Sequence, residues 1–238
     1  MFYRFLYFII MKKVYILSIL FFIPLTLISC RKEIKSEKGG IDVISNVYFH
    51  ASKGLNVMQT FHISKINYSN DSIMEIIPDL HFSEISLEKK FIKDSLCYSL
   101  GETPESVIIS ELVKKQKPIL VYQKKSGAIF SKEEIPNYRN RKRLADTILF
   151  NKKYKRFEIN SPWIYTRFYI YPTDTILPYS LYKHAENDYG GRLERIDSYN
   201  KNTDAFVTLQ IIPRKEWDSE AKEFFSFNHY IIRKIPKK

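Results

Sequence analysis

The sequence predicts an α+β fold built mainly on an antiparallel β-sheet, curved or closed into a partial barrel, with two or three short helices that lie mostly in the first half. Three observations support this fold class. Aromatic residues make up 15% of the 238-residue chain while glycine occurs only seven times, a composition typical of ordered, β-rich proteins. Apolar and polar residues alternate through most of the second half. Short polar turns separate these segments, which favours antiparallel pairing of successive strands.

Nine segments are expected to form strands. The period of two is clearest in residues 205–212, where Val207, Leu209 and Ile211 share one face. In chain order, the expected strands are residues 41–50, 57–68, 119–123, 155–159, 163–171, 176–184, 193–199, 205–212 and 227–234. Residues 74–77 are a short apolar run that ends at Pro78.

Three helices are expected. Ser86 is a suitable N-cap and Gly101 a suitable C-terminal stop for the first. Its apolar face would comprise Leu87, Phe91, Ile92, Leu96 and Leu100. Pro104 opens a second helix over residues 103–115, and a short third helix covers residues 217–225.

The first 29 residues have the pattern of a secretory leader. Lys12 and Lys13 supply the basic region, residues 14–26 supply a short apolar run, and Ser29 is the small residue before the cut. The apolar piece in front of Lys12 is unusual for a leader, so translation is expected to start at Met11. A transmembrane anchor is the alternative, but the apolar run is shorter than the about 20 residues that a spanning helix needs.

The leader ends in Leu27-Ile28-Ser29-Cys30. This run resembles the lipobox of bacterial lipoproteins. The resemblance implies that the Cys30 thiol receives a diacylglyceryl group, that the chain is cut before Cys30, and that the freed amine is acylated. Residues 1–29 would then be the signal peptide, residues 30–40 a lipidated tether and residues 41–238 a single α+β domain, with two subdomains joined around residues 131–145 as the alternative. No family is recognised for the globular part.

The lipoprotein pattern also implies an address. The membrane is the first expected partner, through the lipid on Cys30. In lipoprotein sorting an Asp after the cysteine favours the inner membrane, whereas this chain has Arg31. The expected location is therefore the cell envelope, at the outer membrane and facing the periplasm.

The charge of the chain is strongly basic, with 38 Lys and Arg residues against 26 Asp and Glu residues. Arg4, Lys12 and Lys13 leave with the leader, so 35 basic and 26 acidic residues remain and the net charge is +9. An envelope address excludes nucleic acid as a partner. Another envelope protein, an anionic glycan or an anionic lipid is the expected kind of partner.

Two basic runs carry much of this charge. Arg139, Arg141, Lys142 and Arg143 follow Tyr138, and Lys152, Lys153, Lys155 and Arg156 surround Tyr154. A solvated face, or a loop over residues 131–143, is the favoured interpretation. Attraction to lipid phosphates or anionic glycans is the alternative.

Seven residues are candidates for ligand binding. On a strand over residues 163–171, one face would carry Trp163, Tyr165, Arg167, Tyr169 and Tyr171. Residues 188–192 are expected to form a hairpin turn, which would expose Tyr189 and Arg192 at its tip.

The sequence offers little for catalysis. Asp79 and His81, followed by Glu84, form the tightest acidic and histidine grouping, which makes a hydrolase of envelope polymers an alternative function. Neither a catalytic residue, a metal site nor a cofactor is expected, because motifs for nucleophilic serine, phosphate and zinc sites are missing. Cys97 is the only thiol left in the mature chain and is expected to be structural, partly buried on a helix. The favoured function is a binding or accessory module, and a structural or assembly partner of another envelope protein is the third possibility.

Overall fold

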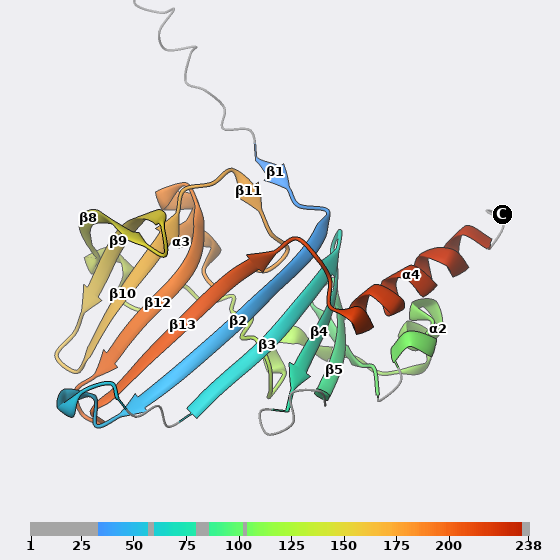
Figure 1. Cartoon of the computed structure of the whole chain (residues 1–238), viewed down its shortest axis with the longest axis horizontal. Coiled ribbons are helices and arrows are strands. Elements are labelled where there is room, and N and C mark those ends of the chain that lie inside the picture. Colours follow the sequence, from blue (N-terminus) through green and yellow to red (C-terminus); the bar gives the residue numbers. More distant parts are fainter. Residues whose placement is uncertain (1–32, 57–59, 80–85, 102–103, 235–238) are drawn as a thin grey trace, which may run out of the picture. The chain divides into compact units, whose positions relative to one another are not determined.

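An eleven-stranded antiparallel sheet, curved and unclosed, carries the fold from Ile34 onward (Figure 1). The computed structural model describes residues 33–56, 60–79, 86–101 and 104–234. The strand order in this sheet is β7-β6-β5-β4-β3-β2-β13-β12-β10-β9-β8. Among the described residues, no helix has the length and apolar character needed to cross a membrane. The prediction of a mainly antiparallel, curved sheet is confirmed.

The strands have the following bounds: β1 Ile34–Lys35, β2 Lys38–Phe49, β3 Thr60–Ser69, β4 Ser72–Pro78, β5 Ser86–Lys93, β6 Leu96–Ser99, β7 Ile119–Leu120, β8 Lys142–Leu149, β9 Lys152–Asn160, β10 Ile164–Tyr171, β11 Thr175–Ile176, β12 Arg192–Asn200 and β13 Ala205–Arg214. The α-helices are α2 Ile109–Lys115, α3 Lys183–Tyr189 and α4 Ser219–Lys234, and the 3-10 turns are η1 Ala51–Lys53, η2 Pro104–Ser106, η3 Val121–Gln123 and η4 Tyr138–Asn140.

One face of the sheet, which we call the covered face, holds the main core. Apolar side chains of the strands, such as Ile41, Ile66 and Phe157, pack there against residues 121–138 and 177–185, which cross behind the sheet in Figure 1. The Phe157 and Phe168 rings stack with their centroids 4.5 Å apart. This layer fixes the sheet and leaves its other face available.

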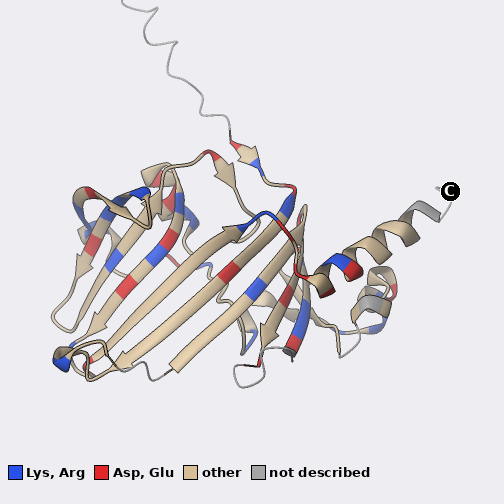
Figure 2. Ribbon diagram, in the orientation of Figure 1, with Lys and Arg blue, Asp and Glu red and all other residues tan. Residues whose placement is uncertain are grey.

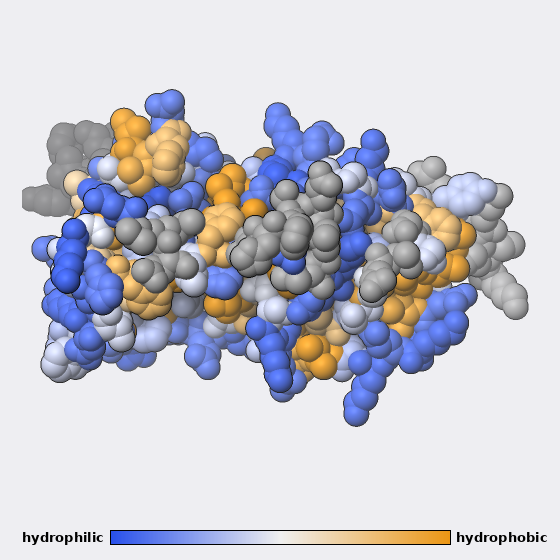
Figure 3. Space-filling model, turned by 60° about the horizontal axis from the view of Figure 1, so that its bottom comes forward, coloured by the Kyte–Doolittle hydropathy of each residue, from blue (hydrophilic) through white to orange (hydrophobic). Residues whose placement is uncertain are grey.

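That other face, the open face, is covered at one end only. There Met74, Phe91 and Tyr98 pack against α4 and α2, which lie beside β4 and β5 in Figure 1. Figure 3 shows apolar surface at this end of the domain, and exposed members on the two helices are Val113, Tyr230 and Ile232. Neither helix extends over β13, β12, β10 and β9, whose open face is toward the viewer in Figure 1.

The predicted helix over residues 86–101 is wrong. This segment forms β5 and β6, joined at Asp94 and Ser95, whose positive φ angles of 50° and 65° suit a two-residue hairpin turn. Phe91 packs under α4 while Ile92 packs in the covered core. Because both faces of β5 are buried, its apolar residues do not alternate, and their spacing imitates a helix. Cys97 is buried as expected, but on a strand.

The predicted strand over residues 176–184 is also wrong. Only Thr175–Ile176 (β11) is strand, and α3 begins at Lys183. The residues expected to form a hairpin turn at 188–191 end this helix, because Gly190 has a positive φ of 60° and serves as its C-cap. The hairpin prediction for Tyr189 and Arg192 is therefore wrong.

The predicted strand over residues 227–234 belongs to α4, which extends the expected third helix to Lys234. Contacts of the buried Asn228 side chain help to explain why the helix continues past residue 225. Its Oδ1 accepts from the Ile109 amide at the start of α2 at 2.9 Å, and its Nδ2 donates to the Val107 carbonyl at 2.9 Å. Two of the three α-helices lie in the second half, so the prediction that helices lie mostly in the first half is wrong.

Three further elements differ in extent. The second helix shortens to α2, preceded by η2, and residues 119–123 contain a strand of only two residues, β7. Part of the basic stretch expected as a loop forms β8, an edge strand of the sheet. The other predicted strands are present with shifted ends.

The start of the domain lies within the expected tether. Ile34–Lys35 pairs in parallel with Thr175–Ile176, and β2 begins at Lys38. A tether would therefore be limited to residues before Ile34. The limits of leader, tether and domain otherwise stay predictions.

Candidate functional site

The open face over β9, β10 and β12 carries a network of tyrosines and charges. Figure 2 shows basic and acidic residues alternating across these strands, whereas β2 and β13 carry few. Tyr165 donates a hydrogen bond of 2.5 Å to Glu158, and Arg167 contacts both of them. Arg195 Nε lies 2.7 Å from Asp197 Oδ1. Strand register places these charges together, because Arg167 on β10 lies opposite Glu158 on β9 and opposite Asp197 on β12.

The structure brings together four of the five candidates on β10. Tyr165, Arg167, Tyr169 and Tyr171 alternate along the strand and share the open face. Trp163 precedes the strand and is 60% exposed. Tyr169 is buried, and this burial, followed by the negative charge of Asp197, raises its pKa.

The two candidates from the predicted turn lie on different faces of the sheet. Arg192 joins the open face, where its guanidinium carbon lies 5.8 Å from the Tyr171 ring. Tyr189 belongs to the covered face, because its ring stacks on Phe157 at 4.8 Å between centroids. Ligand binding by any of the seven residues stays a prediction.

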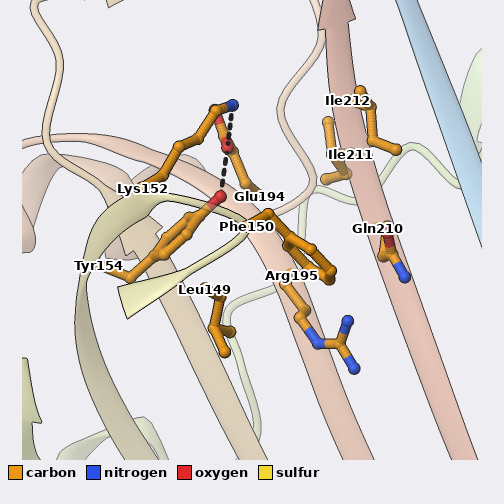
Figure 4. Close-up of a pocket in the computed structure, with 9 residues that line it drawn as sticks. All are labelled: Leu149, Phe150, Lys152, Tyr154, Glu194, Arg195, Gln210, Ile211 and Ile212. Atoms are coloured by element: carbon orange, nitrogen blue, oxygen red, sulfur yellow. Dashed lines mark hydrogen bonds and ion pairs between the residues drawn. The ribbon is translucent and has the colours of Figure 1, made fainter. Parts of the chain in front are cut away.

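A pocket of about 300 Å³ lies at the end of this network (Figure 4). The hairpin that joins β8 to β9 forms one wall, and β12 with β13 forms the other. The turn of the β8–β9 hairpin consists of Phe150 and Asn151, which have positive φ angles of 50° and 60°. The lining residues are Leu149, Phe150, Lys152, Tyr154, Glu194, Arg195, Gln210, Ile211 and Ile212.

Glu194 is the central charged group of the pocket. Its side chain is only 5% exposed and accepts contacts from Arg192 Nη2 at 2.6 Å, Lys152 Nζ at 3.1 Å and Tyr154 Oη at 2.8 Å. Burial, followed by the hydrogen bond to Glu194, raises the pKa of Tyr154 and keeps its hydroxyl protonated. Two cations face this one carboxylate, so the local charge is positive.

The pocket therefore combines an apolar wall with surplus positive charge. Phe150 is 72% exposed, and the guanidinium carbon of Arg195 lies 6.0 Å from its ring. Lys152 Nζ lies 5.1 Å from the Tyr171 ring, which connects the pocket to the network on β10. Chemically, such a site can hold an apolar group and pair an attached anion.

None of the seven candidates lines this pocket, and sequence reasoning connected only Lys152 and Tyr154 of its lining with a possible binding role; Leu149, Phe150, Glu194 and Arg195 were missed. One signal was available: Asn151 stands between two segments rich in β-forming residues, which is typical of a hairpin turn. That signal would have placed Phe150 at an exposed tip. Nothing in the sequence indicates that this tip faces β12 and β13.

The predicted acidic and histidine grouping and the predicted lipidation site are not among the described residues that line this pocket. Asp79 follows the last residue of β4, while His81 and Glu84 lie outside the described residues. Leu27-Ile28-Ser29-Cys30 lies outside them as well. Within the described part of the chain, no three His, Cys, Asp or Glu side chains are grouped to hold a metal ion.

No protein-family model matches the chain, and no curated protein is similar to it in sequence. One solved structure, a Vibrio parahaemolyticus domain described as an outer membrane lipoprotein-sorting protein, aligns over 86% of this chain and 94% of its own with 11% identity and a TM-score of 0.28. This likeness is too distant to bear on fold or function.

Proposed function

We propose that this chain is a lipoprotein of the cell envelope whose domain is a binding or accessory module, and that the pocket between the β8–β9 turn and β13 binds an amphipathic anion. One observation supports the binding proposal: the same pocket contains the exposed apolar ring of Phe150 and, around the single carboxylate of Glu194, more positive than negative charges. An apolar chain or ring would pack on Leu149, Phe150 and Ile212. Its acidic group would pair with Lys152 or Arg195.

The lining supports an anion more than a cation. Glu194 already has three partners within 3.1 Å, so its carboxylate is compensated. Lys152 keeps 42% of its side chain exposed at the rim. A cationic ligand would meet this amine and the Arg195 guanidinium, and like charges in a partly buried site repel.

Photolabelling tests the binding proposal on the intact protein in its membrane. Membranes that contain the protein are incubated with a long-chain fatty acid bearing a diazirine, or with the matching long-chain amine, and irradiated. We expect the acid to label peptides containing Phe150 and Arg195, and the amine to label them weakly.

A matched pair of variants makes this test specific. Phe150→Ser removes the apolar wall and should abolish most of the labelling. Ile148→Ser also replaces an exposed apolar residue of the same hairpin by serine, at a position that is 71% exposed and does not line the pocket, and should preserve the labelling. Equal labelling of both variants would refute the pocket as the binding site.

The proposed anchor is the lipid on Cys30, with the domain at the outer membrane and facing the periplasm. Its support is the lipobox resemblance of Leu27-Ile28-Ser29-Cys30 together with Arg31. Cells grown with labelled palmitate should yield a labelled protein in the outer-membrane fraction. Cys30→Ser should remove the label, and a label that persists in this variant would contradict the anchor.

A second candidate function is assembly with another envelope protein. β8 is the last strand of the sheet order and pairs with β9 on one side, so an eight-residue strand is available to an added strand. Crosslinking from position 148 in membranes tests this. A discrete crosslinked partner would support assembly, whereas the absence of any crosslink would leave the pocket as the functional site.

A further inference from the structure

A second pocket, of about 500 Å³, lies on the opposite side of β9 from the pocket at Phe150. Its lining residues are Arg139, Arg141, Arg143, Lys155, Asp188 and Tyr189. Lys155 and Tyr154 are neighbours on a strand, so their side chains point to opposite faces. The two pockets are therefore separate sites.

The charge of this second pocket is strongly positive. Four cations meet one carboxylate, Asp188, which leaves three surplus positive charges. The side chains of Arg139 and Arg143 are exposed, and neither makes an ion pair or a hydrogen bond to another described residue. Like charges gathered in a hollow repel one another, and a bound anion relieves that repulsion.

Two of the cations are held in place by the fold. The Arg141 guanidinium lies 4.0 Å from the Tyr138 ring centroid, donates to the Tyr138 carbonyl at 3.1 Å and pairs with Asp188 at 3.1 Å. Lys155 Nζ donates to the Tyr189 carbonyl at 2.6 Å. Their fixed positions reduce the ordering cost of binding a ligand.

We propose that this pocket binds a phosphate group. Arginine side chains bind phosphate oxygens through paired N–H groups, and three arginines here line one hollow. Inorganic phosphate has four oxygens in a tetrahedral arrangement and can accept from Arg139, Arg141 and Arg143 at once, whereas a carboxylate has two oxygens in one plane. The phosphodiester of a lipid headgroup keeps the tetrahedral arrangement with two charged oxygens, and its two ester oxygens are weaker acceptors.

The position of the pocket favours the lipid headgroup as the source, a step that rests on the proposed lipid anchor. The domain starts at Ile34, which pairs with Thr175. The connection from Ile176 to Lys183, the first residue of α3, spans at most about 25 Å. The helix that supplies Asp188 and Tyr189 therefore begins within about 25 Å of Ile176, which pairs with β1 at the start of the domain.

Titration calorimetry on the mature lipidated protein in non-ionic detergent tests the proposal. The probes are inorganic phosphate, glycerophosphoglycerol as the soluble headgroup, acetate as the carboxylate control, and a short single-stranded oligonucleotide. We expect one site that takes up phosphate and glycerophosphoglycerol in competition with each other. Acetate should not compete at equal concentration.

Charge reversal locates the site. Because Arg139 and Arg143 have no partner among the described residues, Arg139→Glu with Arg143→Glu should spare the fold, which thermal unfolding checks. Loss of each charge-assisted contact should weaken binding by about tenfold. Lys53→Glu with Lys201→Glu makes the same change of four charges at exposed positions on η1 and on the β12–β13 turn, and should leave binding unchanged.

Four results would overturn the proposal: no uptake of either phosphate probe, equal binding by the double variant, equal competition by acetate, or binding of the oligonucleotide alone. Uptake of inorganic phosphate without the headgroup would support the pocket and remove the lipid as its source. None of these measurements depends on whether the pocket at Phe150 binds a ligand, so the two proposals can fail separately.

Discussion

The Lys124 ammonium lies 2.8 Å from both carboxylate oxygens of Glu75, and their side chains are 3% and 0% exposed. The same carboxylate accepts from the Ser64 hydroxyl at 2.7 Å and from the Ala128 amide at 2.5 Å. Burial lowers the pKa of Lys124, an effect that the charge of Glu75 opposes. This ion pair joins the covered face of β4 to the segment that crosses it.

Lys124→Met should destabilise the fold strongly. It leaves the Glu75 carboxylate buried without its cation, and loss of one partner from a buried pair costs about 3–5 kcal/mol. Lys115→Met is the control, since Lys115 pairs with Glu111 on the exposed surface of α2, where water screens the pair and its loss should change the free energy of unfolding far less. Urea unfolding measures both. Equal losses would contradict a structural role for the buried pair.

Gly127→Ala should be more destabilising than Gly101→Ala. Both glycines have positive φ, 82° and 71°, so alanine meets similar backbone strain of about 1 kcal/mol at each. A Cβ at position 127 would clash with Glu75 Oε1, whereas a Cβ at position 101 meets no atom of the described residues within 4 Å. The difference between the two free energies of unfolding measures this clash. If the variants are equally stable, the approach of residue 127 to Glu75 is not close.

Asp218→Asn should remove a pH dependence. Burial raises the pKa of Asp218, but the hydrogen bond from Asn67 and the charges of Arg214 and Lys65 outweigh it, and the net pKa is lowered. A lowered pKa gives stability that is present above the unfolded pKa near 4 and lost as the pH falls through the folded pKa. Denaturant unfolding should therefore show that acid weakens the wild type more steeply than the variant. The variant should lose about 1–3 kcal/mol at neutral pH. Parallel pH profiles would contradict this assignment.

Cys97 should react slowly with thiol reagents in the folded protein. Burial raises its pKa, which disfavours the reactive thiolate. In a Cys30→Ser form Cys97 is the only cysteine, so release of the chromophore from a disulfide reagent reports on this thiol alone. We expect fast reaction only after unfolding in urea. Rapid reaction of the folded protein would show that the β6 region opens readily.

Sequence patterns predicted the sheet where a strand has one buried face. Residues 205–212 alternate and form β13 as expected. The patterns failed where both faces are buried, as at Phe91 and Ile92, because burial on two sides removes the alternation on which the prediction depends. They also failed for α3, whose Ala185 and Glu186 are buried by tertiary packing rather than by a repeating apolar stripe.

The site was predictable only in part. Alternation along β10 was enough to place Tyr165, Arg167, Tyr169 and Tyr171 on one face. Neither Phe150 nor Glu194 could be added, because their proximity depends on the β8–β9 hairpin and on the register of β12. Such contacts join residues far apart in the chain, and local periodicity contains no information about them.

The central position of β2 has a consequence for the order in which the protein can fold. β2, which begins at Lys38, pairs along its length with β13, which begins at Ala205. During synthesis or export from the amino terminus, one edge of β2 therefore waits for a partner that emerges almost last. Contacts between such distant segments slow folding, and an unpaired strand edge can pair wrongly with other chains. The sheet can be completed only after β13 has been delivered, so one edge of β2 stays open to wrong pairing until then.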